Sequence, residues 1–151
     1  MEKTEDVYNF ILKKISEIGK YLITNNYTPV DIYVQELQAY FEGDAPSGDS
    51  ITLDMVLQKK WLLVHEIIEL SELKKQSFTI NSNLLFTQPA EVFNAHLIAT
   101  EWELALALKE NDRQWIQKRL KDIQSWLADT SLNNELKARC KKLYQMYYEL
   151  R

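Results

Sequence analysis

Very few residues in this chain force the backbone to turn. Only three glycines and three prolines occur among its 151 residues. Sandwiches and barrels need many tight turns between short strands, whereas long helices need few. The composition therefore predicts an all-α fold. The length suits one domain with a substantial hydrophobic core, so we expect residues 1–151 to form a single all-α domain.

Apolar residues recur at helical spacing in six segments. These segments cover residues 4–25, 28–41, 52–76, 89–109, 112–127 and 132–150. Pro29 and Pro89 each precede an acid by two residues near the start of a segment, which suits the first turn of a helix. The polar loop 42–50 and a non-helical connection at 77–88 separate the longer helices. A short last link predicts an antiparallel C-terminal hairpin, so we expect a helical bundle of about six helices.

Charge is distributed unevenly along the chain. Residues 1–108 contain 8 basic and 16 acidic side chains, whereas residues 109–151 contain 10 basic and 6 acidic ones. The basic part is also rich in aromatic residues, and we name it the C-terminal basic-aromatic hairpin. Its basic and aromatic side chains are Lys118, Arg119, Lys121, Lys137, Arg139, Lys141, Lys142, Trp115, Trp126, Tyr144, Tyr147 and Tyr148. Exposed Tyr and Trp favour a protein partner or a homodimer, while the net charge of −4 opposes nucleic-acid binding.

Three features predict a cytoplasmic location without membrane association. The single cysteine, Cys140, cannot close an intramolecular disulfide, which suits a reducing compartment. No stretch approaches the roughly 18 consecutive apolar residues that span a bilayer. The N-terminal sequence MEKTEDVYNF begins with acids where a secretory signal has a basic region.

Two of the expected helices each contain a histidine and a carboxylate on one side. In the stretch VHEIIEL, His65 and Glu69 are four residues apart and therefore adjacent on a helix surface. In the segment 89–109, His96 and Glu103 are seven apart on one stripe between apolar flanks. The middle of that stripe should be buried. A buried carboxylate is costly unless a cation, a proton or a hydrogen-bonded histidine accompanies it.

An antiparallel arrangement of these two helices brings the four side chains together. Counting outward from the connection between the helices places Glu69 level with His96, and His65 near Glu103. The sequence therefore predicts one His/Glu cluster, with Glu66 in an outer, supporting position.

Three uses of this cluster follow from its chemistry. Nitrogen and oxygen ligands on facing helices suit a divalent metal such as zinc or manganese, or a polar small ligand, and would allow a metal-dependent hydrolase. Without a metal, Glu103 with a raised pKa or His65 with a normal pKa would be a general base. Alternatively, two His–Glu pairs are purely structural and fix the helix register. HEIIE is not the zincin motif HExxH, because Glu69 replaces its second histidine.

The stretch EIIEL resembles the first acidic motif of MazG-type nucleotide pyrophosphohydrolases. Those all-α enzymes hold magnesium through paired ExxE and ExxD helices, and Glu66 and Glu69 have the ExxE spacing. The second helix offers Glu101 and Glu103, but Leu104 stands where the ExxD spacing requires an aspartate. The resemblance implies a magnesium role for the first pair, covers a handful of residues and does not extend to the second motif.

Other familiar sites are missing from the sequence. There is no glycine-rich phosphate loop and no GxSxG elbow. The sequence favours an interaction or structural module that acts through the C-terminal basic-aromatic hairpin or by self-association. A metal or small-ligand site in the His/Glu cluster is the alternative, and enzyme activity stays open.

Overall fold

The computed structural model describes residues 2–42 and 51–151, and every regular element in these ranges is a helix. The helices are α1 (Glu2–Thr24), α2 (Val34–Glu42), α3 (Leu53–Gln58), α4 (Lys60–Lys75), α5 (Leu84–Thr87), α6 (Pro89–Lys109), α7 (Arg113–Leu127) and α8 (Asn134–Tyr148). The predicted all-α bundle is therefore confirmed, with eight helices in the described part of the chain instead of about six. None of these helices is long and apolar enough to cross a membrane.

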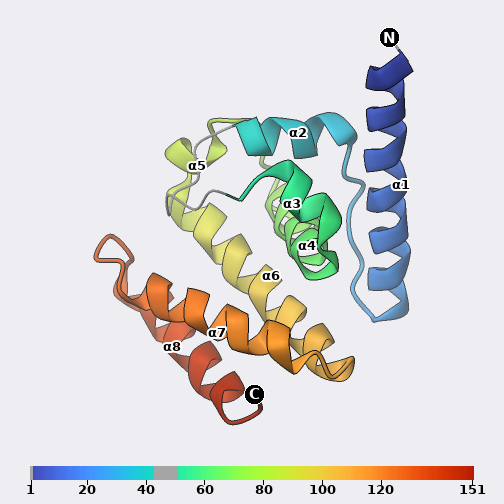
Figure 1. Ribbon diagram of the computed structural model, residues 1–151. Helices are drawn as coiled ribbons and strands as arrows, with labels where there is room; N and C mark the ends of the chain where they lie inside the picture. Colours follow the sequence, from blue (N-terminus) through green and yellow to red (C-terminus); the bar gives the residue numbers. More distant parts are fainter. Residues whose placement is uncertain (1, 43–50) are drawn as a thin grey trace.

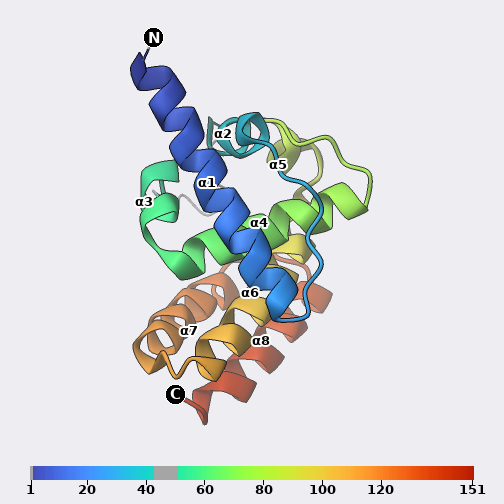
Figure 2. The same ribbon diagram turned by 90° about the vertical axis from the view of Figure 1, so that its right-hand side faces the viewer.

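Helices α4 and α6 form the centre of the bundle. They pack against each other more extensively than any other pair among the described helices. Helix α1 packs across α4, and the α7–α8 hairpin packs across α6 (Figures 1 and 2). The hairpin is antiparallel, as predicted. The site described below lies where α4 and α6 face each other.

Helix α4 is buried on nearly all sides, which is typical of a core helix. Its buried residues are Trp61, Leu62, Leu63, Val64, His65, Ile67, Ile68, Glu69, Leu70, Ser71 and Leu73. The neighbouring helices α1, α3 and α6 all contact it. Burying one large apolar side chain contributes roughly 1.5–3 kcal/mol. The core therefore holds the polar groups of α4 in fixed positions.

The predicted start of the second helix at Pro29 is wrong. Residues 28–33 are not helical, and α2 begins at Val34. Glu36 replaces the expected cap by accepting a hydrogen bond from the Tyr33 amide at 2.9 Å, in the manner of half a capping box. Ile32 is buried just before the helix. Burial of this connecting segment overrides the local helix signal of Pro29.

The predicted helix 52–76 is also divided. It breaks at Lys59, whose extended backbone has φ −116° and ψ 115°, and this separates α3 from α4. Thr52 caps α3 by accepting a hydrogen bond from the Met55 amide at 3.2 Å. Directly after the break, the Trp61 indole donates a hydrogen bond to Asp112 at 2.8 Å. The break thus coincides with a tertiary contact that sequence periodicity does not reveal.

The two predicted linkers have different outcomes. The connection 77–88 contains the short helix α5 and, in the described residues, no strand. Of the loop 42–50, Glu42 ends α2, and residues 43–50 lie outside the described residues. Cys140 is buried in α8.

Candidate metal centre

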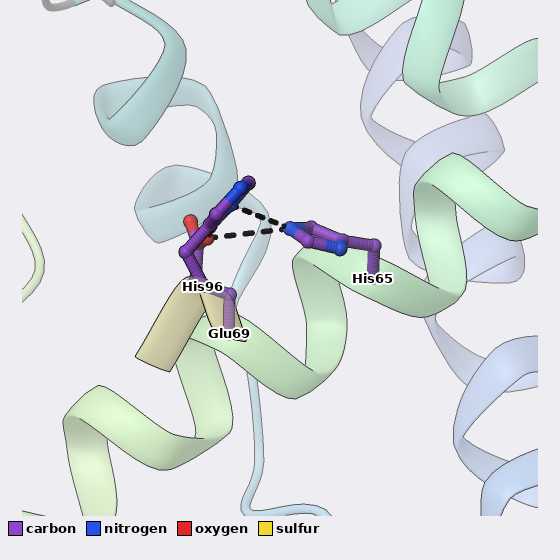
Figure 3. A group of neighbouring side chains, drawn as sticks. All are labelled: His65, Glu69 and His96. Carbon is purple, nitrogen blue, oxygen red and sulfur yellow. Dashed lines mark hydrogen bonds and ion pairs between the residues drawn. The ribbon is translucent and has the colours of Figure 1, made fainter. Parts of the chain in front are cut away.

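Three ligand-type atoms from α4 and α6 meet at one point. His65 Nε2 lies 3.0 Å from His96 Nδ1 and 3.3 Å from Glu69 Oε1. His96 Nδ1 lies 3.0 Å from the same Glu69 oxygen. Figure 3 shows the three side chains pointing toward one another from the two helices. The predicted pairing of Glu69 with His96 and of His65 with Glu103 across the antiparallel helices is confirmed by these contacts.

These separations have the size of a metal coordination sphere. Zinc binds nitrogen and oxygen ligands at about 2.0–2.2 Å, which sets neighbouring ligands roughly 2.8–3.6 Å apart at octahedral or tetrahedral angles. The three atoms form a triangle within this range. Two histidines and one carboxylate in this arrangement resemble the facial sets that leave further coordination positions open.

While Glu69 is ionised, no placement of protons satisfies all three contacts. A proton on His65 Nε2 can point to His96 Nδ1 or Glu69, but the His96 lone pair then faces the carboxylate oxygen at 3.0 Å. A proton on His96 Nδ1 can be shared between Glu69 Oε1 and the His65 Nε2 lone pair, but that lone pair then faces the carboxylate oxygen at 3.3 Å. A second proton on His65 Nε2 would set two N–H groups against each other. A single cation between the three atoms satisfies them together. This is the strongest chemical feature of the cluster.

Glu103 orients His65 from the opposite side. His65 Nδ1 donates a hydrogen bond to Glu103 Oε1 at 2.8 Å, which directs Nε2 toward the other two atoms. Metal-binding histidines usually donate their second nitrogen to a carboxylate in this way. Glu103 is fully buried. It therefore acts behind His65 and not beside the three ligand atoms, a different place from the direct ligand position that the sequence suggested.

Arg119 of α7 is the partner of Glu103 that sequence reasoning missed. It donates two hydrogen bonds to the carboxylate, from Nε at 2.7 Å and from Nη2 at 2.8 Å. The Trp115 indole donates a further one. Burial tends to raise the pKa of Glu103, but the charge of Arg119 and the hydrogen bonds from His65 and Arg119 lower this pKa to about 2. The predicted raised pKa of Glu103 is therefore wrong.

The pKa values of the three ligand residues are also shifted from their ordinary values. Burial lowers the pKa of His65, but hydrogen bonds to Glu103 and Glu69 outweigh it and raise the pKa to about 9. Burial also lowers the pKa of His96. Burial tends to raise the pKa of Glu69, and hydrogen bonds from both histidines bring it well below its usual range. Tyr40, also missed from the sequence, donates a hydrogen bond to Glu69 Oε2 at 2.6 Å.

A cavity of about 530 Å³ lies beside the three ligand atoms. Glu69 and His96 form part of its wall, so a metal ion held there borders the cavity. Its large apolar lining residues are Phe41, Ile51, Leu85, Phe93, Trp126, Leu132 and Leu136. Small-molecule sites in proteins have similar volumes and mostly apolar walls.

Glu66 also lines this cavity. Its Oε2 is buried and has no hydrogen-bond partner among the described residues. Burial, followed by repulsion from Glu69, raises the pKa of Glu66 to about 8. Glu66 lies outside the group of three ligand atoms, and its predicted supporting role stays a prediction.

The aromatic residues of the C-terminal basic-aromatic hairpin are mostly part of the core. Trp115, Trp126 and Tyr147 are buried. Tyr148 is exposed and stacks on Tyr144. The aromatic surface available to a partner is therefore smaller than the sequence suggested.

The MazG-like pairing of acidic helices does not form. Glu101 is exposed on α6, whereas Glu103 is buried against Arg119, so these carboxylates do not share one site. Comparison with protein-family models, curated proteins and solved structures found no match for this chain.

Proposed function

We propose that this protein binds one divalent transition-metal ion through His65 Nε2, His96 Nδ1 and Glu69 Oε1. The observation that supports this most is the triangle of three ligand atoms, 3.0, 3.0 and 3.3 Å apart, that protons alone cannot satisfy. Mixed nitrogen and oxygen ligation suits zinc or manganese. The Arg119–Glu103 pair holds the His65 ring in the orientation that binding needs.

The cavity makes this a candidate reaction centre as well as a binding site. Three protein ligands leave coordination positions for water or a small molecule. A divalent ion in such a site lowers the pKa of bound water and polarises bound oxygen atoms. Because Glu69 and His96 line the cavity, a molecule inside it would reach those positions. We therefore propose metal-dependent chemistry on a small molecule, with hydrolysis as the first reaction to screen.

Calorimetric titration of untagged protein with Zn²⁺ and Mn²⁺ tests the binding. We expect one ion per chain, and His96→Ala should weaken the affinity about 100-fold or more, because one of three ligands is lost. Glu72→Gln is the matched control, since Glu72 lies on the same helix and pairs with Lys75 outside the cluster. It should change the affinity less than about twofold. Wild-type protein that takes up neither ion would refute the proposal.

A second candidate function is docking of a protein partner or a second copy on the C-terminal basic-aromatic hairpin. The observation in its favour is a group of exposed apolar side chains at the end of this hairpin, namely Met146, Tyr148 and Leu150. Size-exclusion chromatography with light scattering would show a dimer that Tyr148→Ser and Met146→Ser dissociate. A cytoplasmic location remains part of this proposal.

A further inference from the structure

The cavity beside the metal centre has an unusual charge distribution. Among the described residues its acidic lining groups are Glu66, Glu69 and Asp129, His96 is its one basic side chain, and no lysine or arginine lines it. The residues outside the described ranges, Met1 and 43–50, contain no lysine or arginine either. A phosphate or carboxylate ligand would therefore find no lysine or arginine in the wall to pair with, and would meet three acidic side chains.

Two of these carboxylates already have partners. Glu69 accepts hydrogen bonds from Tyr40 and lies against both histidines. Asp129 accepts hydrogen bonds from the Ser131 amide and hydroxyl at 2.9 and 2.7 Å. Glu66 differs, because its buried Oε2 has no partner among the described residues. A buried polar group without a partner is costly, and a ligand that donates to it would remove that cost.

Aromatic rings surround the same space. Phe41, Phe93 and Trp126 line the cavity together with Tyr40. The faces of such rings attract organic cations, and an aromatic lining combined with a carboxylate is suited to an ammonium group. The apolar wall fits the remainder of an organic molecule.

We propose that the cavity binds an organic ammonium compound with an apolar body, whose cationic nitrogen pairs with Glu66. Binding of the ammonium compound rests on the cavity and on Glu66, and only the chemistry performed on it rests on the proposed metal centre. The two proposals can therefore succeed or fail separately.

Three probes of equal shape and different charge test this inference: 2-phenylethylamine, 2-phenylethanol and phenylacetate. Each is titrated at neutral pH into wild-type protein, both zinc-loaded and chelator-treated, and followed by calorimetry. The amine should bind about tenfold or more tightly than the alcohol, because a charge-assisted pair is added, and phenylacetate should not bind to the chelator-treated protein.

The variant Glu66→Gln keeps the shape of the side chain and removes the carboxyl group, whose ionised form an ammonium group beside it would stabilise. It should reduce the preference for the amine over the alcohol to about threefold or less in the chelator-treated protein. Glu149→Gln, an exposed position at the end of α8, is the matched control and should keep the full preference. A second variant, Trp126→Leu, should weaken the amine more than the alcohol if the ring contributes to cation binding.

The outcomes separate this inference from the proposed function. Glu66-dependent binding of the amine to protein that takes up no metal would support the inference and refute the metal centre. Metal uptake without binding of the amine would support the metal centre and refute the inference. The inference would be overturned if phenylacetate bound the chelator-treated protein as tightly as the amine or more tightly. An unchanged preference for the amine over the alcohol in Glu66→Gln would also overturn it.

Discussion

At the scale of single residues, Glu103 is the group whose environment matters most. It is ionised and fully buried, and it accepts hydrogen bonds from His65, Trp115 and Arg119. Removing one partner from a buried ion pair leaves the other charge without compensation, which is more costly than removing both. This residue therefore links the stability of the fold to the orientation of His65.

The variant Arg119→Met should lower the free energy of unfolding by about 3–5 kcal/mol, because it leaves the Glu103 carboxylate buried without its cation. Urea denaturation measures this change. The double variant Glu103→Leu/Arg119→Met should lose less than Arg119→Met alone. Lys121→Met, an exposed position on the same helix, should stay within about 0.5 kcal/mol of wild type. Equal losses in Arg119→Met and Lys121→Met would contradict the assigned role of the pair.

The pKa of His65 predicts how the stability of the metal-free protein depends on pH. The pKa is raised from 6.5 to about 9 in the folded state, so the stabilisation it provides is complete below pH 6.5 and lost as the pH rises to 9. The pKa of Glu66 is raised from 4.5 to about 8, so this group adds a further loss of stability as the pH rises from 4.5 to 8. The pKa of Glu103 is lowered from 4.5 to about 2, so the stability that this group provides is lost as the pH falls from 4.5 to 2.

Urea unfolding with a chelator present should therefore show stability falling between pH 6.5 and 9. In His65→Gln the fall should be smaller, because the titrating group is gone, whereas Glu66→Gln should reduce mainly the part below pH 8. The same slope in wild type and His65→Gln would show that His65 does not hold a proton in the way described.

Sequence reasoning identified the residues of the cluster but not all of its partners. His65 and Glu69 are four apart on one helix, and the antiparallel register places His96 and Glu103 opposite them, so local spacing was enough. Arg119 belongs to a helix whose docking angle on α6 does not follow from periodicity. Its position on the apolar side of α7, next to Ile116 and Leu120 in the helical pattern, was the available signal. The prediction of a raised pKa for Glu103 was wrong because it did not include the charge of Arg119.

At the scale of elements, Asp112 joins two helices. Its Oδ1 caps α7 by accepting a hydrogen bond from the Trp115 amide at 3.1 Å, and its Oδ2 accepts one from the Trp61 indole of α4 at 2.8 Å. Asn133 caps α8 through a hydrogen bond from the Leu136 amide at 2.9 Å and has no such second contact among its side-chain hydrogen bonds to described residues.

The variant Asp112→Ala should therefore cost more than a cap alone. We expect a loss of about 2–3 kcal/mol in the free energy of unfolding, the sum of a helix cap and a buried indole left without an acceptor. Asn133→Ala is the matched control and should lose about 1 kcal/mol. Both values come from urea denaturation. Similar losses for the two variants would mean that the Trp61 contact adds nothing.

The differences between expected and observed helices arise from tertiary contacts. Thr28 and Pro29 have the residue types of a helix start, yet residues 28–33 are not helical, and Tyr27 and Ile32 of this connection are buried. Residues 52–76 contain neither glycine nor proline, and the break at Lys59 occurs where Trp61 reaches Asp112. Sequence periodicity reports which face of a helix is apolar, and it does not report such contacts between distant segments.

At the scale of the whole molecule, the bundle places a candidate metal centre of two histidines and one glutamate between α4 and α6. The turn-poor composition and the apolar stripes were sufficient to predict this architecture. The cavity was not predictable, because its wall combines residues from α2, α4, α6 and the α7–α8 connection, whose relative positions depend on the complete packing. The fold thus joins a candidate ion site and a ligand-sized space in one place.

The measurement that tests the central claim most directly is anomalous X-ray scattering at the zinc absorption edge, on crystals of untagged protein grown with Zn²⁺. We predict a single strong peak per chain, about 2.0–2.2 Å from His65 Nε2, His96 Nδ1 and Glu69 Oε1. Crystals of His96→Ala grown in the same way should lack that peak. Wild-type crystals with zinc only at surface positions, and none between these three atoms, would contradict the claim.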